Sequence, residues 1–160
     1  MRTCICSPCG ILGYGFPQES FRRALAEKPD AIVVDAGSTD AGPHKLGAGV
    51  AIVSRMAAKK DLRLLMQGAR ELDIPLVIGS AGGSGARIHT EWTLSIIREL
   101  CDEMDWHPKT AVIWADISNE VILDAMAQGR IEKMSENVPD LTPETLAQTN
   151  GVVAQMGMEP

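Results

Sequence analysis

Short apolar runs alternate with longer stretches of helical periodicity along this chain. Continuous runs at residues 31–34, 75–78 and 110–114 each lead into small or acidic residues, and residues 3–7 are a weaker run of the same kind. Runs that are continuous, as opposed to alternating, are typical of strands buried on both faces of a parallel sheet. We therefore predict a strand at each of these places.

The stretches between the runs carry the pattern of amphipathic helices. In residues 61–73 and 89–104 the apolar positions recur every three or four residues and form one stripe. Ser118 and Thr142 stand where helix N-caps are expected. Helices are predicted at residues 19–28, 61–73, 89–104 and 119–128, from Pro143 onward, and at 151–157. Alternating strands and helices predict an α/β fold, and we expect a Rossmann-like parallel sheet with helices on both faces.

Composition narrows the class of protein. The chain has 160 residues, 45% hydrophobic and 22% charged, which fits a single α/β domain over residues 1–160. The net charge of -6 and the lack of a basic stripe argue against nucleic acid as a partner. No apolar run approaches the roughly 20 residues of a membrane span, so we expect no membrane partner, a cytoplasmic location and reduced cysteines.

Each predicted strand runs into a loop rich in Gly, Ser or Asp. These loops contain residues 7–15, 35–40, 79–87 and 116–118. The carboxyl ends of parallel strands meet at one edge of a sheet, which is where ligands bind in open α/β folds. The sequence therefore predicts one small-molecule site built from these loops.

The loop at residues 79–87 is the most glycine-rich. Glycines allow backbone N–H groups to approach a ligand, a following helix presents its positive end, and an arginine adds a fork for carboxylate or phosphate. We predict ligand contacts from Gly82, Gly83, Ser84, Gly85 and Arg87. The alternative is a tight strand–helix turn that needs small residues. The spacing matches neither the P-loop nor the dinucleotide-binding fingerprint.

Acidic side chains follow two of the predicted strands. Asp35 and Asp116 are candidates for acid/base catalysis, or for metal ligation if they lie together. Ser38 and Thr39 are candidate ligand contacts on the loop after Asp35. In the alternative interpretation, Asp35 caps its own turn by accepting from the backbone of Gly37 or Ser38.

Cys9 and His89 complete the set of catalytic candidates. Cys9 lies in the first loop, where a nearby base would make it reactive, and His89 begins the helix after the glycine-rich loop. An exposed first-turn position is the alternative for His89. Cys4 and Cys6 fit small core residues better than a zinc site, since no second cysteine pair lies nearby in the sequence. Any metal or cofactor stays unknown.

The loop sequences resemble those of one protein family. Residues 7–16 (SPCGILGYGF), 34–40 (VDAGSTD), 79–87 (GSAGGSGAR) and 153–157 (VAQMG) are similar to the acyclic terpene utilisation protein A-like family, in which they belong to the N-terminal part of longer members. The resemblance implies a role in catabolism and a chain that is part of a longer protein. His44 and Lys45 stand where the family leads us to expect an aromatic pair, and Ile88 where it leads us to expect proline. If His44 and Lys45 lie near the pocket, the expected substrate preference differs from that of the family.

These features lead to one expectation about function. We expect a small-molecule catabolic protein that binds an anionic organic acid or an acyl thioester at the carboxyl edge of the sheet. A lyase or hydrolase reaction is the weakly preferred chemistry. The alternative is a non-catalytic binding or assembly subunit, either as a homo-oligomer or with a partner subunit.

Overall fold

The computed structural model describes residues 2–37 and 42–154 of the chain. Their contacts form two compact units, Met1–Trp114 (unit 1) and Ala115–Pro160 (unit 2). The expectation of a single domain over residues 1–160 stays a prediction.

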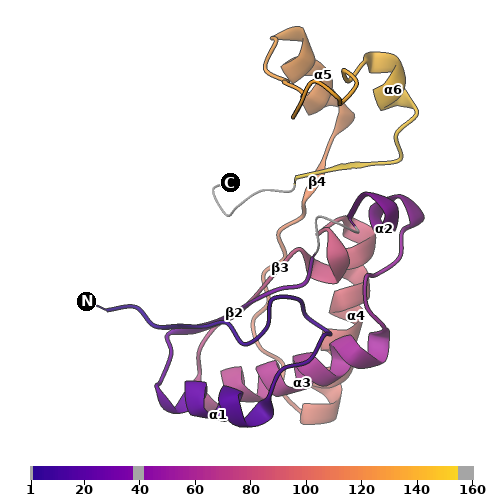
Figure 1. Cartoon of the computed structure of the whole chain (residues 1–160). Coiled ribbons are helices and arrows are strands. Elements are labelled where there is room, and N and C mark those ends of the chain that lie inside the picture. Colours follow the sequence, from indigo (N-terminus) through magenta and orange to yellow (C-terminus); the bar gives the residue numbers. More distant parts are fainter. Residues whose placement is uncertain (1, 38–41, 155–160) are drawn as a thin grey trace. The chain divides into compact units, whose positions relative to one another are not determined.

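Unit 1 contains a parallel sheet of three strands in chain order, β1-β2-β3 (Figure 1). The strands are β1 (Ile5–Cys6), β2 (Ala31–Asp35) and β3 (Leu76–Gly79). Cys6 pairs with Ile32, and Val33 and Asp35 pair with Val77 and Gly79. The predicted α/β character and the first, second and third strands along the chain are confirmed.

Helices connect and follow the strands. In unit 1 they are α1 (Gln18–Ala26), α2 (Gly42–Ala48), α3 (Arg55–Leu72), the short 3-10 turn η1 (Ala81–Gly83) and α4 (Arg87–Met104). Helix α3 begins before the predicted helix at 61–73, at Arg55, where the Ser54 hydroxyl accepts from Ala57 N–H and caps the helix. The C-cap Asp73 is in the left-handed region, which ends the helix.

The core lies on one face of this sheet. Cys6, Ile32 and Val34 are buried against Phe21 of α1 and the apolar stripe of α3. Three strands in chain order, joined by right-handed crossovers, place their connecting helices on the same face, as Figure 1 shows for α1 and α3.

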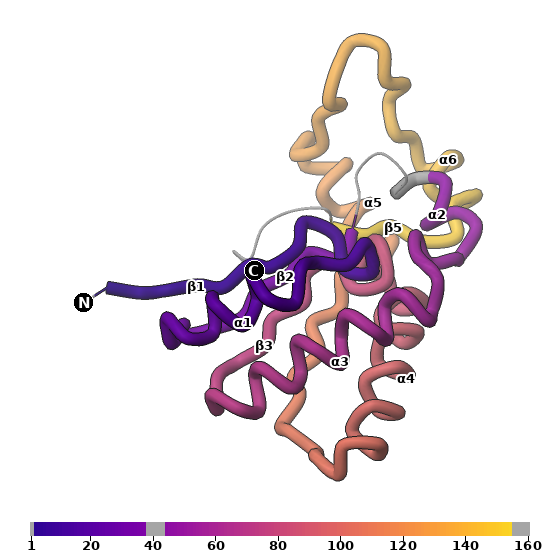
Figure 2. The backbone as a smooth tube through the Cα atoms, turned by 60° about the horizontal axis from the view of Figure 1, so that its bottom comes forward, coloured from indigo at the N-terminus to yellow at the C-terminus, as the bar shows by residue number. Residues whose placement is uncertain are grey.

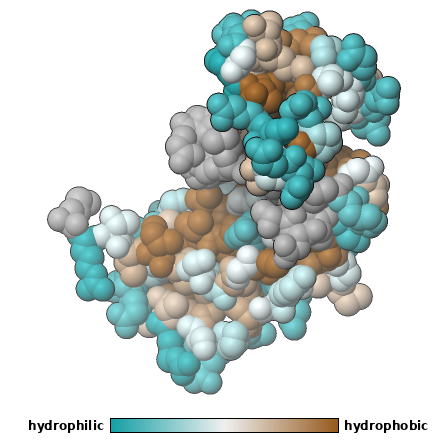
Figure 3. Space-filling view, turned by 45° about the horizontal axis from the view of Figure 1, so that its top comes forward, coloured by the Kyte–Doolittle hydropathy of each residue, from teal (hydrophilic) through white to brown (hydrophobic). Residues whose placement is uncertain are grey.

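The other face of the strands is less covered. Ile5 is 51% exposed, and Val33 and Val77, which pair across β2 and β3, are half-buried and lie outside the core cluster. Figure 3 shows a brown, hydrophobic area on the visible face of unit 1. The described residues thus provide helices over one face of the sheet.

Helices α3 and α4 run side by side, as Figure 2 shows. Leu65, Ile96 and Leu100 are fully buried between them and the sheet. Along the outer side of this pair, cations of α3 meet carboxylates of α4: Arg55–Glu99, Lys59–Glu99, Lys59–Glu103 and Arg63–Glu103. A buried apolar seam with a charged outer edge therefore joins the two helices.

Unit 2 is small. It contains β4 (Asp116–Ile117), α5 (Asn119–Ala127), α6 (Pro143–Ala147) and β5 (Val152–Val153), with β4 and β5 antiparallel. The predicted caps are confirmed, because Ser118 accepts from Val121 N–H and Thr142 from Thr145 N–H. Among the described residues of this unit, Leu146 is the buried hydrophobic one.

Two predicted elements are wrong. Residues 110–114 do not form a strand; Val112 is 37% and Ile113 76% exposed, and pairing begins only at Asp116. Residues 152–153 pair as β5, so the helix predicted at 151–157 is absent from the described part of that range. The apolar run at 110–114 thus has no described strand to pair with, whereas residues 152–153 are extended because they pair with β4.

None of the described helices combines the length and the apolar character needed to cross a membrane.

Candidate functional site

Three strand-end loops of unit 1 meet at the carboxyl edge of the sheet. Leu12 in the first loop donates its backbone N–H to Asp35 O at 2.8 Å, and Ala36 donates to Gly79 O at 2.9 Å. Gly37 packs against Ser80 so closely that a Cβ at residue 37 would lie 2.4 Å from Ser80 Cβ. The predicted convergence is therefore confirmed for the loops that follow β1, β2 and β3.

Asp35 lies at the end of β2 with its side chain exposed. Its Oδ1 accepts from Gly37 N–H at 2.8 Å. This is the Asx turn that was the alternative interpretation. The turn uses one carboxylate oxygen, so Asp35 still presents an acceptor at the edge, and its catalytic role stays a prediction.

The first loop is held by a buried carboxylate that the sequence analysis did not single out. Asp61 of α3 is 2% exposed, and its Oδ2 accepts from Gly13 N–H at 2.8 Å and Gly15 N–H at 2.9 Å. Both glycines have positive φ, which suits a residue without Cβ. The available signal was the position of Asp61 on the apolar stripe of its helix, four residues before Leu65.

Cys9 lies near this carboxylate. Partial burial, followed by the charges of Asp61 and Asp35, raises the pKa of the Cys9 thiol to about 11. The residue is therefore a neutral thiol at pH 7, whereas a nucleophilic cysteine needs thiolate character. Asp61 and Asp35, the residues that shift this pKa, both raise it, so neither activates Cys9 for the predicted catalytic role.

The glycine-rich turn is closely packed. A Cβ at Gly82 would lie 2.4 Å from His89 O, and one at Gly83 would lie 3.1 Å from Ile52 Cγ2. Gly85 is buried, has φ of 71° and donates its N–H to Ala81 O at 3.3 Å. The close contact at Gly82 and the positive φ of both residues (73° and 134°) thus account for glycine at residues 82 and 83 without a ligand, and ligand contact by these residues stays a prediction.

Ser84 and His89 form a buried pair behind the turn. Ser84 Oγ and His89 Nδ1 are 2.7 Å apart, and the two residues are 2% and 1% exposed. His89 Nε2 is buried and makes no hydrogen bond within the described part of the chain. Burial lowers the pKa of His89, and the nearby carbonyls of Val50 and Lys45 oppose this by less. His89 is neither an exposed first-turn residue nor freely accessible to a ligand.

The N-terminus of α4 faces the carboxyl edge from the end of this turn. The N-cap Ala86 supplies no side-chain acceptor, and the first turn carries no acidic residue. A helix end of this kind favours an anion. Arg87 is exposed, and its guanidinium carbon lies 4.1 Å from the centre of the Trp114 ring, which holds the cation by a cation–π contact.

Three predicted site residues do not take part in these contacts at the carboxyl edge. Ser38 and Thr39 lie outside the described residues. Asp116 is exposed in β4 of unit 2, and its role beside Asp35 stays a prediction. No group of three or more acidic, histidine or cysteine residues suited to a metal occurs among the described residues.

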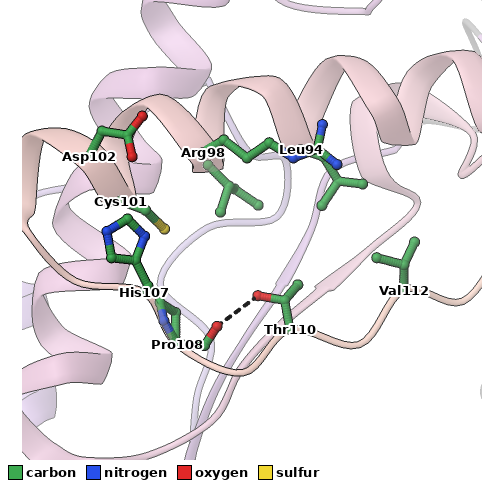
Figure 4. Close-up of a pocket in the computed structure, with 9 residues that line it drawn as sticks. Leu94, Arg98, Cys101, Asp102, His107, Pro108, Thr110 and Val112 are labelled. Carbon is green, nitrogen blue, oxygen red and sulfur yellow. Dashed lines mark hydrogen bonds between the residues drawn. The ribbon is translucent and has the colours of Figure 1, made fainter.

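A pocket of about 350 Å³ lies elsewhere in unit 1, between α4 and residues 107–112 (Figure 4). Arg98, Asp102 and His107 contribute polar groups to it, and Thr110 Oγ1 donates to Pro108 O at 3.3 Å. None of the predicted site residues lines it. It adjoins the apolar segment that was predicted as a strand and is unpaired, so it fits incomplete packing beside α4 better than a built ligand site.

Comparisons with known proteins add no relatives: no family model, no curated protein and no solved structure matches this chain.

Proposed function

We propose that unit 1 binds an aliphatic carboxylic acid, or its acyl thioester, at the carboxyl edge of its parallel sheet, in a catabolic role. The observation that carries the proposal is the meeting of three strand-end loops, tied together by the Leu12–Asp35 and Ala36–Gly79 backbone hydrogen bonds. Ligands of open α/β folds bind in this place.

The charges at the edge support an anionic group on the ligand. The helices α3, α5 and α6 are capped by Ser54, Ser118 and Thr142. The N-termini of α1 and α4 lack a side-chain cap, and α1 carries Glu19 in its first turn whereas α4 has no acidic residue there. An incoming carboxylate or thioester oxygen would accept from amides of this helix end, with the Arg87 charge nearby. Asp35, on the neighbouring strand, is the acid/base candidate for the uncharged part of the ligand.

The resemblance to the acyclic terpene utilisation family supports an acyclic, branched chain on that acid. A Rossmann-like sheet with helices on both faces also belongs to this proposal, because the parallel sheet formed by the described residues of unit 1 has three strands and is covered on one face. The test is calorimetry with citronellate and citronellyl-CoA, with citronellol as the neutral control. Binding of citronellol as tight as that of citronellate would contradict an anion-binding edge.

A non-catalytic binding or assembly subunit is the second candidate function. It is favoured by the state of two catalytic candidates: Cys9 is a neutral thiol, and His89 is buried against Ser84. Asp35→Asn separates the two functions. A lyase or hydrolase loses turnover of citronellyl-CoA, followed by mass spectrometry, and keeps its affinity, whereas a binding subunit has no turnover in the wild type.

A further inference from the structure

We propose that Ser80 is a ligand-contacting residue of this edge, and that its hydroxyl donates a hydrogen bond to the carboxylate or carbonyl oxygen of the bound acid. The inference rests on the proposed function and adds a residue that the sequence analysis did not select. It follows from the backbone of Ser80, the state of its hydroxyl and its neighbours.

The backbone of Ser80 is held in an unfavourable region. Its φ and ψ are 49° and 41°, the left-handed conformation. The other described non-glycine residues with positive φ are Lys28, Asp73 and Asp105, and each follows the end of a helix, where this conformation is common. Ser80 instead follows strand β3. Glycine would adopt this conformation at less cost, and glycine occurs at residues 79, 82, 83 and 85 of the same loop.

The hydroxyl of Ser80 has no structural task that would explain serine. It precedes the η1 turn without capping it, and no hydrogen bond from it is found within the described part of the chain. The side chain is exposed. A serine that is strained, exposed and without a partner fits a group kept for contact with something outside the chain.

The neighbours of Ser80 leave room for its side chain at the edge. Gly37 has no Cβ, and one built there would lie 2.9 Å from Ser80 Oγ. Gly37 is itself held by the Asp35 carboxylate. Ser80 therefore stands between the Asp35 turn and the η1 turn that leads to α4. A hydroxyl in this place donates to a ligand oxygen and accepts from a ligand N–H or O–H, which suits a carboxylate or an acyl carbonyl.

The experiment compares Ser80→Gly and Ser80→Ala with the wild type, using citronellate in calorimetry and thermal unfolding without ligand. Ser80→Gly removes the backbone strain and should raise Tm by about 2–5 °C. Ser80→Ala keeps the backbone cost and removes only the hydroxyl. Both variants should bind citronellate about tenfold or more weakly, since a hydrogen bond to a charged group is lost.

Asp73→Gly is the matched control, because Asp73 has φ of 53° and lies at the exposed C-terminus of α3. It should also gain stability but keep the affinity of the wild type. If both Ser80 variants bind citronellate with the affinity of the wild type, this inference is overturned and the proposed function remains intact. A loss of Tm in Ser80→Gly also overturns it, since serine would then be structural. Absence of wild-type binding to citronellate and citronellyl-CoA overturns both proposals.

Discussion

At the level of single residues, the loops of the carboxyl edge are shaped by packing as much as by any ligand. Gly82 faces the backbone of His89, Gly83 faces Ile52, and Asp61 holds Gly13 and Gly15. Two ionisable groups, His89 and Cys9, lie within this packing. Their protonation can be measured before any ligand is known, and each gives a prediction.

Replacing His89 should change how stability depends on pH. Burial lowers its pKa in the folded state below the value of about 6.5 in the unfolded chain, so the unfolded chain binds more protons just below that pH. The contribution of neutral His89 to the free energy of unfolding is therefore fully present above about pH 6.5 and is lost as the pH falls below it. Urea unfolding should show the free energy of unfolding of the wild type falling between about pH 6.5 and 5. In His89→Asn, whose amide oxygen can still accept from Ser84, this fall should be smaller by up to about 1.4 kcal/mol per pH unit. Equal slopes in both proteins would show that His89 does not titrate on unfolding.

Asp61→Asn should make Cys9 more reactive. The variant removes a negative charge that helps raise the Cys9 pKa to about 11, and its amide oxygen can still accept from Gly13. Each unit by which the pKa falls increases the thiolate fraction about tenfold. Alkylation of Cys9 by iodoacetamide at pH 8, followed by peptide mass spectrometry, should therefore accelerate severalfold. Asp73→Asn, at an exposed helix end, should leave the rate unchanged, and an unchanged rate in Asp61→Asn would mean that the Asp61 charge does not control the thiol.

At the level of elements, the buried seam between α3 and α4 should contribute more to the free energy of unfolding than the ion pairs along the outer edge of these helices. Leu65 is fully buried, and Leu65→Ala should cost about 2–5 kcal/mol of unfolding free energy in urea. Lys59→Met removes two exposed ion pairs with Glu99 and Glu103 and should cost clearly less. The Lys59 effect should also shrink as NaCl is raised, because exposed charges are screened. A larger loss in Lys59→Met than in Leu65→Ala would reverse this assignment.

The elements that could be predicted from sequence are those specified by local signals. The stripe of α3 and the caps Ser118 and Thr142 act within a few residues of the chain, so pattern and structure agree there. Residues 110–114 carry a strand pattern, but a strand also needs a neighbour to pair with, and β3 does not pair with them. The pattern at 151–157 likewise did not identify β5, whose partner β4 lies more than thirty residues earlier.

The candidate site could likewise be predicted only in part. Its position at the strand ends could be predicted, because the parallel order of strands decides where loops gather. The apolar stripe marks Asp61 as unusual, but its role depends on a loop about fifty residues away. The role proposed for Ser80 depends on a backbone angle, which the sequence does not show. The glycine-rich sequence was ambiguous for a physical reason: close packing against His89 and close approach to a ligand both require the absence of Cβ.

At the level of the whole molecule, burial differs sharply between the two units. The core cluster lies in unit 1, whereas α5 has no buried residue and Leu146 is the buried hydrophobic residue among those described in unit 2. Backbone amides exchange with solvent through local opening, and the free energy of opening rises with the apolar contacts that must break. Amides of α3 and α4 should therefore exchange slowest, and those of α5 should exchange faster by orders of magnitude at pH 7 in hydrogen-exchange mass spectrometry. Leu146→Ala provides the internal check, because it should speed exchange in α6 and leave α3 unchanged. Protection of α5 as strong as that of α3 would contradict this prediction, because it would show that the stability of α5 does not follow from its own buried apolar contacts.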